Sequence, residues 1–422
     1  MSGSDSFDFD ALERRKKREL DEIEQRRAAR VDARREQLRH VHRRRRAAAG
    51  ALLTLLVAGL AGAWTVFGGD SRTPSSKPET VAAPTTTTKK QRVAPAHVAM
   101  PEQVRAVHVG VGAMGDLSRF WKLATPDGKG LNALQIDIKD ENGEIGFVAN
   151  VPSLARKSGA ARPYYDANEV VRQAHARDVY VIGRIVTFKD PAIAKARPDL
   201  AVKTQSGEVW FDGSGNWLNH YDPRVWNYLI GLAKAGAKAG MDEIQFDYVR
   251  FPSEGDPQDT AVWPNARKEP YSTTIERFVA KARKELKPYG VKLSIDVFGL
   301  AATHELGIGQ DIKKLAKHVD VVSPMAYPSH YASGEYNIPD PPQAPYETVV
   351  FTMGDFRAAV RGTDATIRPF LQDFYGYTPE QVKAQVRAAV EGGAKGWLLW
   401  NPLSQYTPSG VDARSTELAA TN

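Results

Sequence analysis

The chain has 422 residues, enough for two or three domains or for one large barrel with additional segments. Its 42% hydrophobic and 25% charged residues are close to globular averages, which excludes wholesale disorder and a polytopic membrane protein. There is no cysteine, so disulfides, thiolate metal sites and cysteine nucleophiles are excluded. The formal charge of +7 comes from the first hundred residues, because 101–422 carry 37 Lys and Arg against 38 Asp and Glu. We therefore expect no nucleic-acid partner.

The N-terminal segment, residues 1–46, carries 15 Lys and Arg and 10 Asp and Glu. Within it, residues 11–46 contain strong helix formers and neither Gly nor Pro, and opposite charges recur three and four residues apart, as in Glu22 and Arg26. This pattern predicts a cytoplasmic basic helix lying near anionic lipid. A helix that docks on a specific cytosolic partner is the alternative.

Residues 47–67 form a run of 21 uncharged residues. A helix of this length spans roughly 31 Å, enough for the hydrocarbon core of a bilayer. Four arginines, Arg43 to Arg46, precede the run, which places the N-terminus inside and everything after Phe67 outside. A cleaved signal peptide is the competing interpretation, but its apolar core and leading segment would be shorter. We therefore predict a single-pass, uncleaved transmembrane helix.

Residues 68–100 are rich in Thr, Pro, Ser and Ala, and include four consecutive threonines from Thr85 to Thr88. Such a segment has too few large apolar residues to bury a core and is typical of an extended linker. It would hold the C-terminal domain away from the membrane. The last residues, 411–422, are expected to be a C-terminal tail.

Residues 101–410 alternate short β-branched runs with helical patterns, the clearest of which are 223–239, 272–287, 311–318 and 379–391. Eight such units predict an α/β fold, a (β/α)8 TIM barrel. The strand runs are 105–112, 133–140, 179–188, 243–251, 292–299, 320–327, 367–374 and 396–401. An open doubly wound sheet is less favoured, because the glycines after the first run lack the GxGxxG spacing.

Side chains alternate along a strand, so each run divides into a face toward the helices and a face toward the barrel axis. The last run leaves open whether Trp400 or Asn401 points inward, and Asp373 is expected to point outward. The residues predicted to point inward are Gln135, Asp137, Lys139, Arg184, Gln245, Asp247, Ser294, Asp296, Ser323, Met325, Tyr327, Arg368, Phe370 and Gln372.

Three of these inward residues, Asp137, Asp247 and Asp296, are carboxylates, which cost several kcal/mol to bury unless they are paired. One would most often be a structural ion pair. Three that converge on one barrel mouth indicate a functional site. Aromatic residues near the expected mouth would suit stacking against sugar rings or simply packing in the core. They are Trp210, Phe211, Trp217, His220, Tyr221, Trp263, Tyr331, Tyr336, Trp397 and Trp400.

The fourth run contains the motif FDYVRFP, Phe246–Pro252. Six further motifs occur in order: DIKDENG (137–143), RIVTFKDP (184–191), DVFG (296–299), SPMAYPSHY (323–331), RPFLQDF (368–374) and GWLLWN (396–401). Together they resemble a bacterial family of glycosyl hydrolase domains whose function is not established. The resemblance covers 103–405 and implies a TIM barrel distantly similar to α-amylase-type and α-galactosidase-type barrels.

In those relatives the nucleophilic Asp follows the fourth strand, which corresponds to Asp247 here. Their acid/base residue is a Glu after the fifth strand or an Asp after the sixth. This chain has Asp296 in the fifth run and no acid in the sixth.

Glycoside hydrolysis requires one ionised carboxylate and one carboxylic acid. Asp247 and Asp296 would lie on adjacent strands about 4.8 Å apart, which suits the carboxylate separation of a retaining enzyme. Arg250 or Arg184 could keep Asp247 ionised, while a less solvated Asp296 keeps its proton. A metal-dependent hydrolase is less favoured, because His108, His220, His304 and His330 do not form a ligand cluster. There is no GxSxG nucleophile motif either.

The sequence thus predicts a membrane-anchored, extracellular glycoside hydrolase acting on a cell-surface or cell-wall polysaccharide, without cofactor or metal. Asp247 and Asp296 are the expected catalytic residues. The expected substrate-binding residues are Asp137, Lys139, Arg184, Arg250, Tyr327, Gln372 and Trp400. The alternative is a catalytically silent barrel that binds glycan and organises the cell envelope.

Overall fold

A computed structural model describes residues 97–124 and 130–407, which belong to one compact unit, Lys89–Asn422. The predicted cytoplasmic helix, the transmembrane segment 47–67, nearly all of the linker and the C-terminal tail lie outside these residues. Within the two described ranges, no helix is both long enough and apolar enough to cross a bilayer. The predicted membrane topology therefore stays a prediction.

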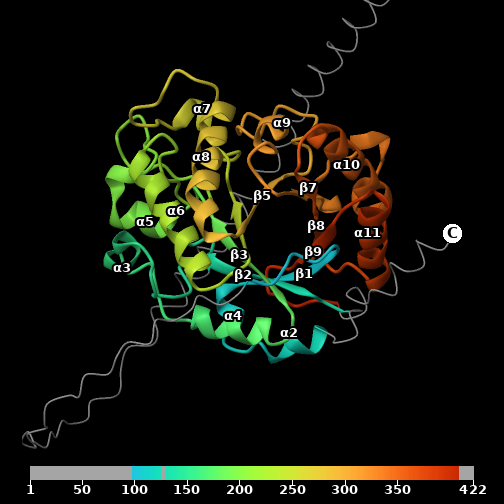
Figure 1. Cartoon of the computed structure of the whole chain (residues 1–422). Helices are drawn as coiled ribbons and strands as arrows, with labels where there is room; N and C mark the ends of the chain where they lie inside the picture. Colours follow the sequence, from blue (N-terminus) through green and yellow to red (C-terminus); the bar gives the residue numbers. More distant parts are fainter. Residues whose placement is uncertain (1–96, 125–129, 408–422) are drawn as a thin grey trace, which may run out of the picture. The chain divides into compact units, whose positions relative to one another are not determined.

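The strands form a closed parallel barrel, seen along its axis in Figure 1. Every run predicted from the sequence is found, so the (β/α)8 prediction is confirmed. The seventh run is interrupted at Arg368 and Pro369, because proline has no N–H to donate to a neighbouring strand. The strands are β1 Val104–Val109, β2 Ala133–Lys139, β3 Tyr180–Val186, β4 Glu243–Asp247, β5 Lys292–Phe298, β6 Val321–Met325, β7 Thr366–Ile367, β8 Phe370–Gln372 and β9 Gly396–Trp400.

Helices surround the strands (Figure 1). The helices predicted over 223–239, 272–287 and 379–391 match closely, whereas the helix predicted over 311–318 covers only Ile312–Leu315. Helix α10 was not predicted, because its apolar residues are spread around the helix. Start signals are visible in the sequence: Asp222 caps α6, and Thr378 forms a capping box with Gln381 on α11. The helices are α2 Ser118–Leu123, α3 Ser153–Lys157, α4 Ala167–His175, α5 Pro191–Ala196, α6 Pro223–Lys238, α7 Pro257–Thr260, α8 Tyr271–Leu286, α9 Ile312–Leu315, α10 Pro345–Val360 and α11 Pro379–Glu391.

Most of the apolar core lies between the strands and the helices, and the barrel interior contains only a small apolar cluster. One level of the interior is polar. Arg368 donates to both carboxylate oxygens of Glu243, with Nη1 3.1 Å from Oε2, and Tyr180 and Ser294 donate to the same carboxylate. These contacts run between strands across the barrel, so they confirm that Ser294 and Arg368 point inward.

The first and last strands close the barrel by pairing, with Val104 opposite Gly396 and Val107 opposite Leu399. The segment after β9 then crosses back over β1. There, Ser404 Oγ accepts from the Gly110 amide at 3.1 Å, and the Tyr406 hydroxyl donates to the His108 carbonyl at 2.6 Å. These contacts hold the end of β1 in place.

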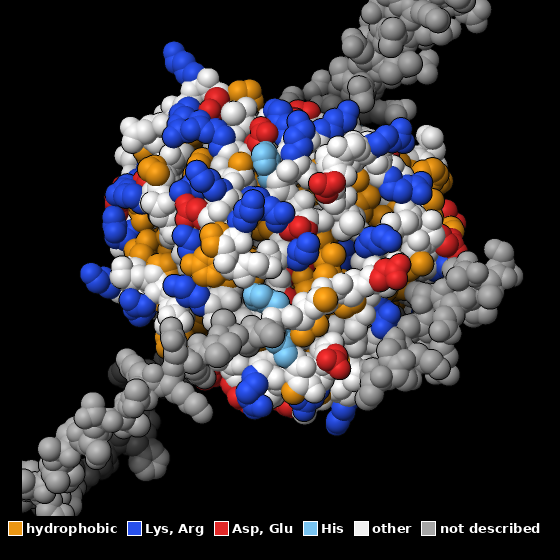
Figure 2. All heavy atoms as spheres, viewed as in Figure 1, with side chains coloured by type: hydrophobic (Ala, Val, Ile, Leu, Met, Phe, Trp, Pro, Cys, Tyr) orange, Lys and Arg blue, Asp and Glu red, His pale blue; other side chains and the backbone are white. Residues whose placement is uncertain are grey.

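The surface in Figure 2 shows Lys and Arg side chains scattered among acidic and hydrophobic ones. This mixture agrees with the nearly balanced charge of residues 101–422.

Candidate active site

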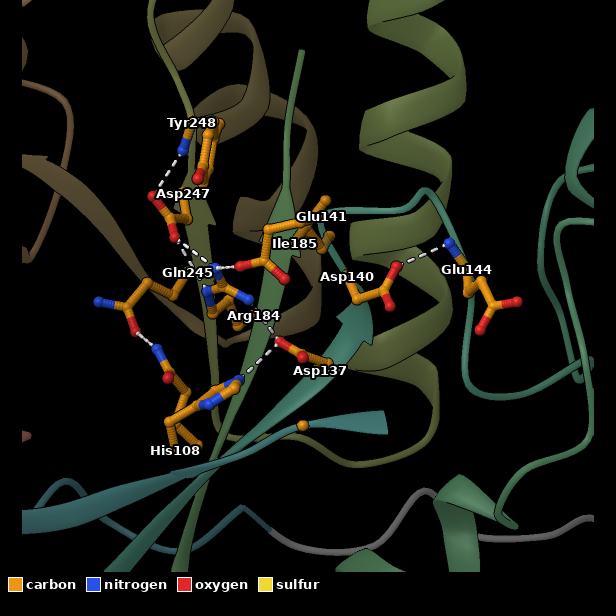
Figure 3. Close-up of polar contacts among 12 residues, drawn as sticks. His108, Asp137, Asp140, Glu141, Glu144, Arg184, Ile185, Gln245, Asp247 and Tyr248 are labelled. Carbon is orange, nitrogen blue, oxygen red and sulfur yellow. Dashed lines mark hydrogen bonds and ion pairs between the residues drawn. The ribbon is translucent and has the colours of Figure 1, made fainter. Parts of the chain in front are cut away.

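The Arg184 side chain is the centre of a buried ionic cluster at the carboxyl ends of β2, β3 and β4 (Figure 3). Its Nε and Nη2 donate to Asp247 Oδ2 at 3.0 and 2.6 Å, and its Nη1 donates to Asp137 Oδ1 at 2.8 Å. Nη2 also donates to Glu141 Oε1 in the loop after β2. Three carboxylates therefore converge on one guanidinium.

Strand register explains this convergence. Asp137 is paired with Arg184 across β2 and β3, and Val186 is paired with Asp247 across β3 and β4. Since the strands are parallel, their carboxyl ends meet at one end of the barrel, where TIM barrels carry their functional groups. The structure thus brings together Asp137, Arg184 and Asp247, as the alternation pattern predicted.

The charges in the cluster stabilise one another. Burial alone would lower the pKa of Arg184, but Glu141, Asp137 and Asp247 raise it well above its usual range. Burial likewise favours a protonated Asp137, yet His108 and Arg184 outweigh it, so the net pKa of Asp137 is lowered. Asp137 is therefore a carboxylate that keeps its charge.

Trp400 lies over this cluster, which settles the inward residue of the last strand. The His108 ring stacks on Trp400 with centroids 4.1 Å apart, and its Nε2 lies 3.0 Å from Asp137 Oδ1. The Arg184 guanidinium carbon lies 4.7 Å from the centroid of the Trp400 ring. Trp400 thus belongs with the cluster, and so does His108, for which no role was predicted from the sequence.

Asp247 and Asp296 lie on the neighbouring strands β4 and β5. They directly follow Phe246 and Ile295, which are paired with each other. Asp296 Oδ1 accepts from Gln245 Nε2 at 2.5 Å, and Asp296 Oδ2 has no hydrogen-bond partner in the described part of the chain. Asp296 is only 1% exposed. Burial, followed by the nearby charge of Asp247, raises the pKa of Asp296 well above the usual range. Asp296 therefore holds its proton to a higher pH than an ordinary carboxyl group does.

Lys139 does not join the cluster, although the alternation placed it there. The strand register shifts between Asp137 and Lys139, which turns the lysine toward the loop after β3. There its Nζ lies 3.0 Å from Asp190 Oδ2 and donates to the Lys189 carbonyl at 2.9 Å. The lysine thus ties the end of β2 to the loop after β3 below the surface, a structural role.

Arg250 is also turned away from Asp247. The strand ends at Asp247, and Tyr248 adopts a left-handed backbone with φ of 48°, so the alternation of β4 does not extend to residue 250. The Arg250 guanidinium lies against the Phe298 and Tyr248 rings, 4.6 and 5.0 Å from their centroids, and donates to the Phe251 carbonyl at 3.0 Å. Of the two arginines considered, Arg184 is the one that holds Asp247.

Gln372 and Tyr327 are buried inside the barrel mouth. Gln372 Oε1 accepts from the Ser329 amide at 3.1 Å, so it shapes the loop after β6. Burial, followed by the charges of Asp247 and Asp296, raises the pKa of Tyr327. Tyr327 is thus a buried residue that senses the charge of both carboxyl groups, while Gln372 acts on the loop after β6.

Glu141 is the site residue that sequence reasoning missed. It lies in a tight turn in which Asp140 Oδ1 accepts from the amides of Asn142 and Glu144 at 3.0 and 2.8 Å (Figure 3). Gly143 has φ of 81° and packs so closely on Asp190 that a Cβ would collide with it. The motif DIKDENG contains this turn, but a loop has no periodicity from which the direction of Glu141 could be read.

Most of the aromatic residues in the insertion after β3 are core residues. Trp210, Trp217 and His220 are buried, and the His220 ring stacks on Phe251 with centroids 4.0 Å apart. Burial lowers the pKa of His220 to about 3, so it is neutral. The aromatic side chain exposed after β8 is Tyr375, which is 80% exposed and meets Phe374 edge-on with centroids 4.8 Å apart.

Across residues 97–124 and 130–407, no group of three or more His, Asp and Glu side chains could hold a metal ion. The site is thus defined by carboxyl groups, a guanidinium and aromatic rings.

The sequence profile of a family described as "Putative glycosyl hydrolase domain" matches residues 106–406. The chain belongs to this family. The resemblance inferred from the motifs is therefore confirmed, and the barrel is an enzyme domain of the glycoside hydrolase type. No curated protein sequence matches the chain.

The chain is similar to several solved structures, and the first of them agrees on the fold. The PgaB (BpsB) glycoside hydrolase domain from Bordetella bronchiseptica is 15% identical, with a TM-score of 0.54 over 75% of this chain and 98% of that chain. A hypothetical protein from Ruminiclostridium thermocellum is 36% identical over 45% of this chain and 97% of that chain, with a TM-score of 0.41. The glycoside hydrolase domain of PelA from Pseudomonas aeruginosa is 10% identical over 73% and 97%, with a TM-score of 0.45.

Proposed function

We propose that this family member hydrolyses glycosidic bonds in a cell-surface or cell-wall polysaccharide, with Asp247 as the ionised carboxylate of a two-carboxylate mechanism. The observation that carries the proposal is the environment of Asp247. Its Oδ2 accepts two hydrogen bonds from Arg184, and its Oδ1 accepts from the Tyr248 amide at 2.6 Å. A carboxylate held in this way has a fixed orientation, as a nucleophile at an anomeric carbon must have.

The reaction also needs a carboxylic acid that protonates the leaving oxygen. Asp137 is poorly suited, because His108 and Arg184 lower its pKa. The pKa of Asp296, the acid expected from the sequence, is raised, as the mechanism requires of a proton donor. However, its side chain is enclosed, so it would reach a glycosidic oxygen only if the sugar entered the barrel interior. This enclosure counts against Asp296 as the proton donor.

Aromatic rings at the mouth would bind the sugar chain. Trp400 lies over Arg184, and Phe374 connects the buried Tyr327, at a centroid distance of 5.4 Å, to the exposed Tyr375. Rings in contact that run outward from the carboxyl groups offer flat apolar faces for successive sugar units. This arrangement favours a polymeric substrate over a small glycoside.

The cellular location is part of the same proposal. The uncharged run 47–67 with arginines before it supports a membrane anchor with the N-terminus in the cytoplasm and the barrel outside. A barrel in that position would meet glycans of the cell envelope.

The test is the release of reducing ends from a panel of envelope polysaccharides by the full chain in mild detergent. Asp247→Asn should reduce the rate by about 10³-fold or more, because an amide is not a nucleophile and does not stabilise positive charge. Asp199→Asn, which changes an exposed ion pair with Arg197, is the matched control and should behave as wild type. A wild-type protein that binds glycans of the panel but releases no reducing ends would instead support a silent binding barrel.

A further inference from the structure

We propose that Glu141 is the general acid and base of this site, donating a proton to the leaving oxygen and later taking one from water. The inference rests on the proposed glycoside hydrolysis at Asp247. It is carried by the position of Glu141 relative to Asp247 and by its access to solvent.

The first argument is separation. Asp247 Oδ2 and Glu141 Oε1 both accept from the same atom, Arg184 Nη2. Because each oxygen lies one hydrogen-bond length from that nitrogen, the two oxygens are within about 5 Å of each other. Retaining glycosidases hold their two carboxyl groups about 5–5.5 Å apart. The pair is therefore close enough for a covalent glycosyl-enzyme mechanism and well inside the roughly 6.5–9.5 Å that an inverting enzyme needs.

The second argument is access. The Glu141 side chain is 34% exposed, whereas those of Asp137 and Asp296 are enclosed. Glu141 projects from a loop at the mouth and not from a strand, so it can leave Arg184 when a sugar arrives. A residue that protonates a leaving oxygen and then activates a water molecule needs contact with both substrate and solvent.

The third argument is hydrogen bonding. Arg184 holds Asp247 with two hydrogen bonds and Glu141 with one, so Glu141 is the less firmly held of the two carboxyl groups.

The chemical steps balance. An Asp247 oxygen forms a bond to the anomeric carbon while the bond from that carbon to the leaving oxygen breaks, and the leaving oxygen takes the proton of Glu141. The Glu141 carboxylate then removes a proton from water, whose oxygen bonds to the anomeric carbon. The bond to Asp247 breaks, and its electron pair returns to the carboxylate. Water is the only co-reactant, and the sugar keeps its anomeric configuration.

The experiment compares Glu141→Gln with Glu144→Gln in the full chain. Glu144 lies in the same loop and its side chain has the same 34% exposure, but it pairs with Arg162 and Tyr164 instead of Arg184. Each variant is assayed on a polysaccharide that the wild type cleaves and on the 2,4-dinitrophenyl glycoside of the same sugar. The dinitrophenolate leaves without being protonated, so its release needs no acid.

We expect Glu141→Gln to slow polysaccharide cleavage by about 10²-fold or more and to remove the basic limb of the pH–rate profile. Release of dinitrophenolate in the first turnover should remain within a fewfold of wild type, and Glu144→Gln should match wild type throughout. Glu141→Asp, which keeps the acid on a shorter side chain, should retain the basic limb at a reduced rate.

Three results would overturn the assignment. Polysaccharide cleavage by Glu141→Gln at the wild-type rate, together with its loss in Asp296→Asn, would make Asp296 the acid. An inverted first product would require a more distant pair of carboxyl groups. A wild type that cleaves neither substrate, for every sugar on the panel, would refute the hydrolase proposal itself and this assignment with it.

Discussion

The buried Asp296 carboxyl group should make the free energy of unfolding depend on pH. Its pKa is raised well above the usual range by burial and by Asp247, so the folded protein keeps a proton that the unfolded chain releases. Stability from this group is fully present below the ordinary carboxyl pKa and is lost as pH rises toward the raised value. The loss is about 1.4 kcal/mol for each pH unit in that window.

Asp296→Asn removes this dependence, because an amide stays neutral at every pH. Near pH 4 the variant and the wild type should have similar stability, since both side chains are then uncharged and similar in shape. As pH rises, the free energy of unfolding of the variant should increase relative to that of the wild type by about 1.4 kcal/mol per pH unit. This corresponds to about 2 °C in melting temperature for a domain of about 300 residues. The variant should thus be the more stable protein at pH 7.

The assay is thermal unfolding of the full chain between pH 4 and pH 8, monitored by circular dichroism. Asp320→Asn provides a control of opposite sign. Burial favours a protonated Asp320, but the Leu293 amide and Arg283 outweigh it and lower its pKa. Asp320→Asn should therefore lower the free energy of unfolding at neutral pH, and this loss should become smaller as the pH falls. A difference between wild type and Asp296→Asn that does not change with pH would mean that Asp296 is ionised in the folded protein, and the reasoning would fail.

Three further outcomes are expected. Lys139→Met should lower the free energy of unfolding by about 3–5 kcal/mol, because it leaves the buried Asp190 without the ammonium group that lies 3.0 Å away. Chemical denaturation measures this loss, and a value below about 1 kcal/mol would contradict the structural role of the ion pair. Tyr375→Ala should raise KM for polysaccharide about three- to tenfold with kcat unchanged, and an unchanged KM would exclude stacking on this ring. Protease added to intact cells should cut within 68–100 or remove the barrel, and a barrel cleaved only after lysis would refute the extracellular location.

The fold was predictable because its signals are local and repeated. Each strand is a short β-branched run, and alternation within a run is sufficient to direct Asp137, Arg184 and Asp247 into one barrel. The three inward carboxylates were the informative feature, since a buried charge requires a partner. The order of the strands indicated which side chains could meet, but it left open whether Arg184 or Arg250 holds Asp247.

The errors arose where regular alternation stops. A register shift after Asp137 turns Lys139 to another loop, and the left-handed Tyr248 ends the pattern before Arg250. Glu141 projects from a turn whose direction depends on Asp140 and on packing against Asp190, a contact between distant parts of the chain. Bulges, left-handed residues and loops are set by three-dimensional packing, so a single sequence gives no period from which to read them.

The seam between β1 and β9 has a consequence for how the protein is made. Contacts across the seam join residues nearly 300 positions apart, such as the Tyr406 hydroxyl and the His108 carbonyl, with a separation of 298 residues. While the chain is being synthesised, β1 therefore has an unpaired edge until the last strand has emerged, and long-range closure of this kind is slow. Until then, His108 lacks Trp400 on its face, and Arg184 lacks the ring that covers it. The candidate site is thus incomplete until the last strand has been synthesised, so a chain truncated before β9 should show no glycosidase activity.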